Sequence, residues 1–562
     1  MSPAQALADS IPALHPNTDQ SHPTSSYTAT PAMIASSSKT REQDPSHSSY
    51  EIPYDQASSS SSSSFLSPIT PQVQSPLLRA PSEIIQKVLS TSGGEEVHAI
   101  ASAAKVCKEL RSMIYENPDQ ALWRQVLVQH YDDPRTAAAF PVPRSSSSIN
   151  WKKNVQHRER VRRIFSDWAE DKLNQVKQHI DLIIPTLLNM YLDISPTTPS
   201  SDPSTADDSP NSTLLSTWLR SSLFKHIYES QYFTEPEPTT SYQLRSSPKR
   251  IKRKTVDPVI SQLHCLIPPA YDDDTREDRE WRGFMRRTVY NAKNFEEEND
   301  YGPFTPDGKV NWELIDAISS VMMCNAQELI KGDPTAWLPA VQPLSYGVEP
   351  VRGWGYTDLK RPDSLADGQV WDWAGIEGTW CGCYAFMDYV DWVALNYPQS
   401  AFLHRLSSEI DLSLYHEALG DLMQLDLKIC NDPYSSNPRE NRCEYHEFTT
   451  DRFPQPLPSM ETDLPTSSLL PPLYFHGSSV PYAGGEAPPL PQNAIRGVVT
   501  LTADDPPQVR WTMIIRYRNE DRWRLECVQV GGRGSKRGFF GIWSDASRGE
   551  QSPCGPAWYW KV

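Results

Sequence analysis

The chain contains little cysteine, no long hydrophobic run and no excess of basic residues. Its nine cysteines among 562 residues have no regular spacing, and its first residues lack the charged and then apolar pattern of a signal segment, so a secreted disulfide scaffold is not expected. No apolar stretch approaches the roughly 20 residues that cross a bilayer. A formal net charge of -17 argues against a protein that coats nucleic acid. We therefore expect a soluble protein of the cytoplasm or the nucleus, with neither nucleic acid nor a membrane as partner.

Proline, serine and threonine are abundant instead. With 50 prolines, the chain has stretches that bury too little apolar surface to offset the entropy of ordering, and we expect these to be disordered. Between them the pattern is first helical and then β, which predicts an α+β multidomain protein. We divide the chain into a disordered tail (1–75), a small helical module (76–131), a helical extension (132–195), a low-complexity linker with a basic cluster (196–255), a mixed helical segment (256–362) and a β-rich domain (363–562).

The β-rich domain has the alternating patterns and turn residues of antiparallel strands. About eight strands suffice to close a small barrel and so remove exposed sheet edges. If the strand near Trp558 pairs with the strand that contains Trp380, the barrel closes and would fold alone from about Asp363, unless residues 292–330 cap it. The expected strands are 376–386, 422–430, 473–475, 495–502, 509–517, 523–530, 538–543 and 557–562.

The helical module opens with Pro81, which stands where a helix can start, and with four apolar residues that we expect on one helix face. Val106-Cys107 and Leu122-Trp123-Arg124 follow, and together these residues resemble the F-box motif, although Ala80 replaces the usual leucine. The resemblance implies docking on a Skp1-type linker protein within a cullin-RING ubiquitin ligase, through an apolar helix face. An ordinary helical hairpin is the alternative. The implied contact and core residues are Pro81, Ile84, Ile85, Val88, Leu89, Val106 and Cys107.

The segment Gly378-Thr379-Trp380-Cys381-Gly382-Cys383-Tyr384 places Trp380, Gly382 and Tyr384 on one side of a strand and both cysteines on the other. With Tyr301-Gly302-Pro303-Phe304, Gly541-Ile542-Trp543 and the terminal Trp558-Tyr559-Trp560, it resembles fungal F-box proteins with a lipocalin-like C-terminal domain. A barrel mouth rimmed by aromatic residues and arginines would form a recognition surface. Core tryptophans and solvated arginines are the alternative. The candidate surface residues are Trp380, Tyr384, Arg516, Arg522 and Trp543.

The linker carries a basic run, unusual in so acidic a chain. Lys249, Arg250, Lys252 and Arg253 resemble a nuclear localisation signal, with a solvated charge run as the alternative.

We expect no catalytic, cofactor or metal site. Cys381 and Cys383 lack the spacing of a zinc ribbon, and Cys430, Cys443 and His446 share only their residue type. His416-Glu417 lacks the second histidine of the metalloprotease helix. The glycine-rich run Gly531–Lys536 lacks the spacing of a phosphate-binding loop and fits a turn between strands.

The leading hypothesis is a substrate-recognition adaptor of an SCF-type (Skp1-cullin-F-box) ubiquitin ligase, which holds an unknown protein target without supplying reacting groups. One alternative is a lipocalin-like small-molecule carrier or enzyme whose helices are only structural. A nuclear scaffold is a third hypothesis, which leaves the β domain unexplained.

Overall fold

The computed structural model of the chain describes residues 76–91, 96–140, 142–168, 178–195, 209–232, 256–267, 275–332, 361, 365, 369–397, 410–420, 422–430, 460–481, 493–517, 520–535, 537–548 and 553–561. The chain divides into two compact units, Met1–Ala80 and Pro81–Val562. In the first unit, the described residues include the 3-10 helix η1 (Pro76–Arg79). None of the described helices is both long and apolar enough to span a membrane.

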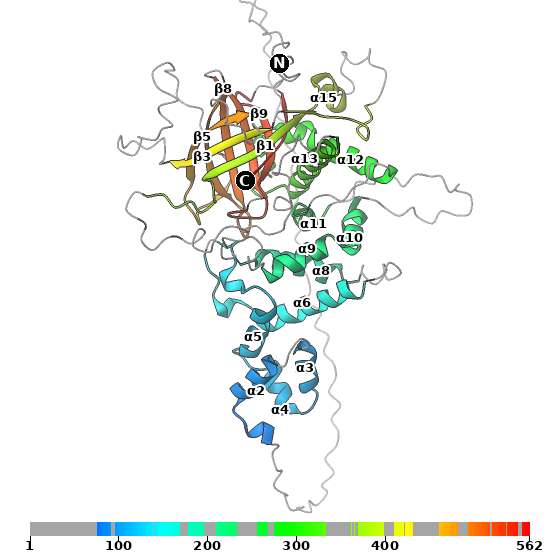
Figure 1. Ribbon diagram of the computed structural model, residues 1–562, viewed down its shortest axis with the longest axis vertical. Helices are drawn as coiled ribbons and strands as arrows, with labels where there is room; N and C mark the ends of the chain where they lie inside the picture. The colour runs from blue at the N-terminus through cyan, green and yellow to red at the C-terminus, as the bar shows by residue number, and fades with distance from the viewer. Residues whose placement is uncertain are drawn as a thin grey trace, which may run out of the picture. The chain divides into compact units, whose positions relative to one another are not determined.

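Helices fill most of the second unit before the barrel (Figure 1). In chain order they are α2 (Ser82–Ser90), α3 (Glu96–Ala103), α4 (Lys108–Tyr115), α5 (Ala121–His130), η2 (Pro134–Thr136), η3 (Ser146–Ser148), α6 (Trp151–Ser166), α8 (Ile180–Leu192), α9 (Pro210–Leu219), α10 (Ser222–Tyr232), α11 (Pro258–His264), α12 (Arg276–Val289), η5 (Ala292–Phe295), η6 (Glu297–Asn299), α13 (Trp312–Gly332) and α15 (Tyr389–Asn396). Capping side chains fix the residue at which several of these helices begin. Asn150 caps α6, and Ser209 caps α9 just before Pro210 at the first helical position.

The strands form a closed antiparallel barrel. Eight of them follow the order β1-β3-β5-β6-β7-β8-β9-β10, and β10 returns to β1 with Trp380 opposite Lys561. The expected closure by the terminal strand is therefore confirmed, and so is each of the eight expected strands, although β5 runs on to Pro481. The strands are β1 (Gly378–Phe386), β2 (Ala418–Leu419), β3 (Met423–Cys430), β4 (Thr466–Ser467), β5 (Leu473–Pro481), β6 (Asn493–Thr502), β7 (Val509–Tyr517), β8 (Glu520–Gln529), β9 (Phe539–Asp545) and β10 (Cys554–Lys561).

Aromatic side chains fill the barrel interior. The ring centroid of Trp511 lies 5.1 Å from that of Trp380 and 4.6 Å from that of Phe539. An eight-stranded barrel is just wide enough for side chains to fill it. The alternation along β1 is as expected, because Trp380 joins the interior cluster whereas Cys381 and Cys383 face the helices. These rings occupy the space in which a lipocalin-like carrier would hold its ligand.

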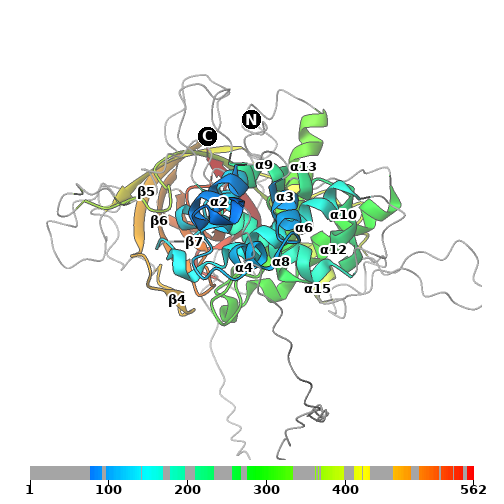
Figure 2. The ribbon, with the colours of Figure 1, turned by 90° about the horizontal axis from the view of Figure 1, so that it is seen from below.

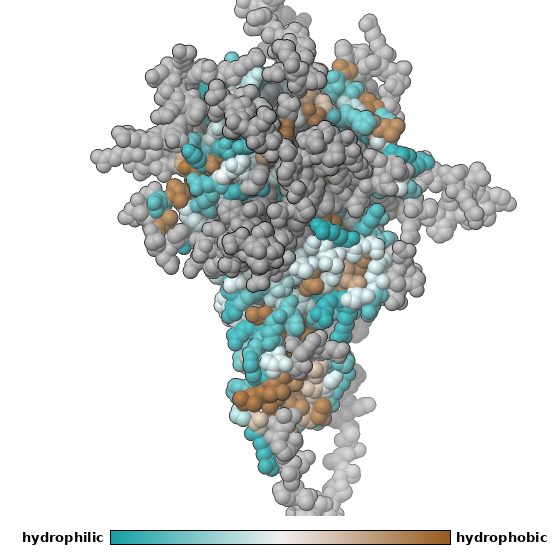
Figure 3. Space-filling model, viewed as in Figure 1, coloured by the Kyte–Doolittle hydropathy of each residue, from teal (hydrophilic) through white to brown (hydrophobic). Residues whose placement is uncertain are grey.

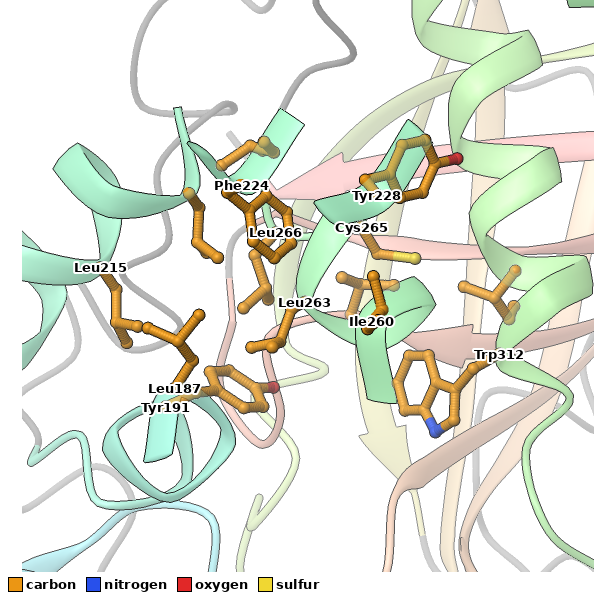
Figure 4. Close-up of a cluster of buried hydrophobic side chains, with 14 of the residues drawn as sticks. Leu187, Tyr191, Leu215, Phe224, Tyr228, Ile260, Leu263, Cys265, Leu266 and Trp312 are labelled. Atoms are coloured by element: carbon orange, nitrogen blue, oxygen red, sulfur yellow. The ribbon is translucent and has the colours of Figure 1, made fainter. Parts of the chain in front are cut away.

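A second core joins the helices to the outer wall of the barrel. Figure 4 shows part of it, with Leu187 of α8, Phe224 of α10 and Leu263 of α11 pointing toward one another. Helix α13 extends this core onto β9 and β10 (Figure 1 and Figure 2), where Phe540 and Trp558 face outward. Helix α13, which belongs to residues 292–330, thus covers this part of the barrel wall.

The glycine-rich turn between β8 and β9 anchors one end of the barrel to two turns of the helical part, one after η2 and one after α11. Arg533 donates to the carbonyl oxygen of Ala138 at 3.0 Å, and Arg537 donates to those of Cys265 at 2.6 Å and Ile267 at 2.9 Å. Both guanidinium groups are buried, and burial lowers the pKa of Arg533 to about 10. The expected turn between strands is confirmed.

A buried ion network fixes a loop to the outer wall of β7 and β8. Arg510 pairs with Glu526 at 2.8 Å and also with Asp300, which pairs in turn with Arg548. Asp300 and Tyr301 have φ of 54° and 56°, in the left-handed region, and the Arg548 guanidinium lies 4.6 Å from the centre of the Tyr301 ring. The ion pairs hold this loop in place against its backbone strain.

Candidate functional site

Helix α2 divides its apolar residues between two stripes. Ile84 and Val88 face outward with 55% and 59% of their surface exposed. Ile85, about 100° further round the helix, is buried, and Leu89 packs against the main core. The inward stripe is buried because α2 packs against α5. The expectation that all four residues share one face is therefore corrected: two build the module and two remain open.

Val106 adds a further exposed apolar residue, with 74% of its surface exposed, just before α4. The neighbouring Cys107 is the N-cap of α4, and its Sγ accepts a hydrogen bond from the Leu110 amide at 3.5 Å. Pro81 is the N-cap of α2. Figure 3 shows hydrophobic side chains gathered on the surface of this module. Ile84, Val88 and Val106 are therefore the exposed apolar residues of this module that the motif predicted.

Four aromatic side chains meet where β1, β8 and β9 reach the same end of the barrel. Tyr384 lies 5.3 Å and Trp523 lies 5.1 Å from Trp543, both edge to face, and Phe386 lies 6.4 Å from Tyr384. The Arg522 guanidinium lies 5.0 Å from the centre of the Trp523 ring. Tyr384, Phe386 and Trp523 are half-buried and therefore accessible in part. Tyr384, Phe386, Trp523 and Trp543 are hereafter the aromatic rim.

Two of the expected surface residues lie elsewhere. Trp380 is fully buried, and its indole N–H donates to the Ile376 carbonyl at 2.8 Å, so it is a core residue and no part of a surface. Arg516 lies 3.9 Å from Asp521, a carboxylate that also pairs with Arg496 at 2.7 Å. Arg516 is thus largely buried in an ion-pair cluster. The other expected surface residues, Tyr384, Arg522 and Trp543, lie at or beside the aromatic rim.

The aromatic rim lies at the opposite end of the barrel from the glycine-rich turn. Strand β8 begins at Glu520 beside the rim and ends at Gln529, shortly before Arg533 and its contact with Ala138. At about 3.3 Å per residue, such a strand spans roughly 30 Å. The contacts of Arg533 and Arg537 and the aromatic rim therefore lie at opposite ends of the barrel.

No family model, curated protein or solved structure matches this chain.

Among the described residues, no group of three or more His, Cys, Asp or Glu side chains is placed to hold a metal ion. Cys381 and Cys383 are buried, and burial raises the pKa of both thiols to about 12. Glu417 pairs with Arg286 at 2.7 Å. Cys443, His446 and the basic residues Lys249, Arg250, Lys252 and Arg253 lie outside the described residues.

Two features near the rim were not predicted from the sequence. Trp523 belongs to it, and the signal was present, because Trp523, Leu525 and Cys527 alternate inward along β8. Helix α15, which directly follows β1, was also missed. Its apolar residues follow Tyr389 and are interrupted by Asp391. This pattern is typical of neither a polar loop nor an alternating strand.

Proposed function

We propose that the chain is a substrate-recognition adaptor of an SCF-type ubiquitin ligase. Helix α2 docks on a Skp1-type linker protein and, through it, on a cullin-RING ligase. The barrel end with the aromatic rim holds a protein target for ubiquitination. The adaptor itself supplies no reacting groups, since holding the target beside the transferring enzyme raises its effective concentration.

The outward stripe of α2 is the observation that carries the proposal. Ile84 and Val88 are four residues apart, on the same helix face, and both are more than half exposed. A helix that lays such i, i+4 anchors into a groove is a recurring mode of recognition. Burying a side chain of this size is worth about 1.5–3 kcal/mol. The stripe is available for a partner because the module uses Ile85 and Leu89 for its own packing.

The separation of the two barrel ends supports a division of labour. One end contacts the helical part through Arg533 and Arg537. The rim end contacts α12 through Glu417 and Arg286, but its Tyr384, Phe386 and Trp523 are only half-buried and can contact a target. A carrier of small molecules is less well supported, because Trp380, Trp511 and Phe539 pack against one another inside the barrel.

Copurification of the linker protein with full-length variants tests the proposal. Replacing both Ile84→Asp and Val88→Asp should reduce copurification by at least about tenfold, since charged side chains do not enter an apolar groove. Val128→Asp on α5, at another exposed valine of the same module, is the matched control and should retain the partner. Thermal melting of both variants should stay close to that of the parent. Undiminished copurification of the double variant would contradict the docking claim.

A further inference from the structure

Helix α15 is apolar nearly all round, yet none of its residues is buried. Six of its eight residues are apolar, in the segment Tyr-Val-Asp-Trp-Val-Ala-Leu-Asn. A helix this short is marginal by itself in water, and helices that are hydrophobic on every side are normally enclosed. It follows β1 directly, at the end of the barrel that carries the aromatic rim. Among the described residues, none covers Tyr389, which is 50% exposed.

One side of α15 is held by the segment after α12. Asn396 donates to the Tyr290 carbonyl at 2.9 Å and accepts from the Ala292 amide at 2.8 Å. The Trp392 ring lies 6.3 Å from that of Phe295, edge to face. These contacts, and the packing of Trp392 and Leu395 against the main core, fix the position of the helix and leave Tyr389 half exposed.

The exposed apolar surface at Tyr389 continues onto residues 410–416 at Leu414, whereas Leu412 of the same segment is buried. The Tyr415 hydroxyl donates to Asp391 at 3.1 Å, which ties this segment to α15. Next to that contact Leu414 is 63% exposed, and Tyr389 on the helix is 50% exposed. Figure 3 shows hydrophobic side chains on the surface in the region of α15. Apolar surface of this kind, edged by polar residues, is typical of an interaction site.

Carboxylates outnumber basic side chains around this surface. Segments 291–299, 387–397 and 410–416 contain a single lysine, Lys293, and no arginine. Helix α12, which packs against residues 412–413, adds Arg286, which is paired with Glu417, and the exposed Arg287. Such a border attracts a basic partner and repels nucleic acid or an acidic segment. The carboxylates of these segments are Glu296, Glu297, Glu298, Asp388, Asp391 and Asp411.

We propose that α15 and residues 410–416 form a docking surface for a protein segment that is both basic and apolar. Its apolar side chains cover Tyr389 and Leu414, and its lysines or arginines face the surrounding carboxylates. The proposal rests on the proposed function, because it gives a target class to the target-binding end of the barrel.

Three synthetic peptides of equal length and spacing are the probes: one with Lys and Leu, one with Glu and Leu, and one with Lys and Ser. Their affinity for the full-length protein is measured by fluorescence anisotropy. The Lys and Leu peptide should bind at least about tenfold more tightly than either of the others, and its binding should weaken as salt rises. Equal binding of all three peptides, or of none, would overturn the proposal.

Two sets of variants locate the site. Tyr389→Ser with Leu414→Ser should weaken the Lys and Leu peptide by at least about tenfold, since apolar anchors dominate such interfaces. The matched control, Val370→Ser with Leu469→Ser, changes exposed apolar residues elsewhere and should have no effect. Replacing Asp388, Asp391 and Asp411 with Asn should flatten the salt dependence. Binding that survives both sets lies elsewhere and contradicts the proposal.

Copurification of the linker protein separates this inference from the proposed function. The variants near α15 should leave copurification unchanged, because they leave the outward stripe of α2 and its packing against α5 intact. If the Lys and Leu peptide binds while the parent protein fails to retain the linker, the adaptor role fails and the docking surface stands. If the linker is retained and the variants do not change the affinity for the peptide, the docking surface is contradicted and the adaptor role is not.

Discussion

Ile84 and Ile85 are identical neighbours in the sequence, yet one is exposed and the other is buried. About 100° of helix rotation separates them, and α5 lies on one side only. The spacing of the apolar residues predicted the helix correctly. It did not predict which stripe packs inward, because that depends on a tertiary contact. Replacing Ile85 or Leu89 therefore tests folding and docking together, whereas Ile84 and Val88 test docking alone.

The buried Asp132 gives a prediction about pH. Its carboxylate accepts hydrogen bonds from the Ser209 hydroxyl and from the Ser195 amide, but burial outweighs these bonds and raises its pKa to about 6 from 3.8. A carboxyl group with a raised pKa favours folding when it is protonated. This stabilisation is complete below about pH 4 and is lost as the pH rises through about 6.

Asp132→Asn, which is neutral at every pH and keeps an acceptor oxygen, should remove that dependence. Between about pH 5 and pH 8 the variant should gain on the order of 1 kcal/mol of unfolding free energy relative to the parent. Urea unfolding at several pH values measures the difference. Parallel curves for the parent and the variant would show that Asp132 does not titrate as described.

At the scale of elements, the strands were the most predictable part of the fold. Alternation and turn residues are local properties, and they located all eight barrel strands. The second half of β5 was missed because Gly477, Ser478 and Ser479 carry no apolar signal, and the strand exists there through its pairing with β3 and β6. Helix α15 was missed because its apolar run lacks a polar face.

The glycine-rich turn gives a paired test of backbone strain. Gly538 has φ of 106°, and a Cβ there would lie 1.9 Å from the Tyr559 carbonyl oxygen. Gly532 also has a positive φ, of 84°, but the nearest atom to its Cβ would be the Tyr191 hydroxyl at 3.9 Å. Gly538→Ala should therefore cost several kcal/mol, and Gly532→Ala only about 1–2 kcal/mol. Thermal melting compares them, and equal losses would refute the clash at Gly538.

At the scale of the whole molecule, closure of the barrel was predictable, whereas cover of its wall by residues 292–330 was only one of two alternatives. The terminal strand has the pattern of a strand in its own sequence. The outer wall of β7 to β10 is buried by α13 and by the loop at Asp300. No local sequence pattern predicts those contacts. The cover explains why Phe540 and Trp558, which face outward from their strands, are apolar.

A fragment of residues 363–562 should therefore fail to fold by itself. It lacks Asp300, one of the two carboxylates that pair with the buried Arg510, and it exposes the outward faces of Phe540 and Trp558. Breaking a buried ion pair costs about 3–5 kcal/mol. We expect residues 81–562 to melt in one cooperative transition and the fragment to aggregate or melt without cooperativity. A sharply melting, soluble fragment would disprove this dependence.

Direct titration of the purified full-length chain with a purified Skp1-type linker protein tests the central claim, that α2 docks the chain onto a ubiquitin ligase. Isothermal calorimetry should give a one-to-one complex with a submicromolar dissociation constant in the parent and in Val128→Asp. Binding should weaken by at least about tenfold in the Ile84→Asp, Val88→Asp variant, which loses both apolar anchors. No binding by the parent, or equal binding by all three proteins, would contradict the account.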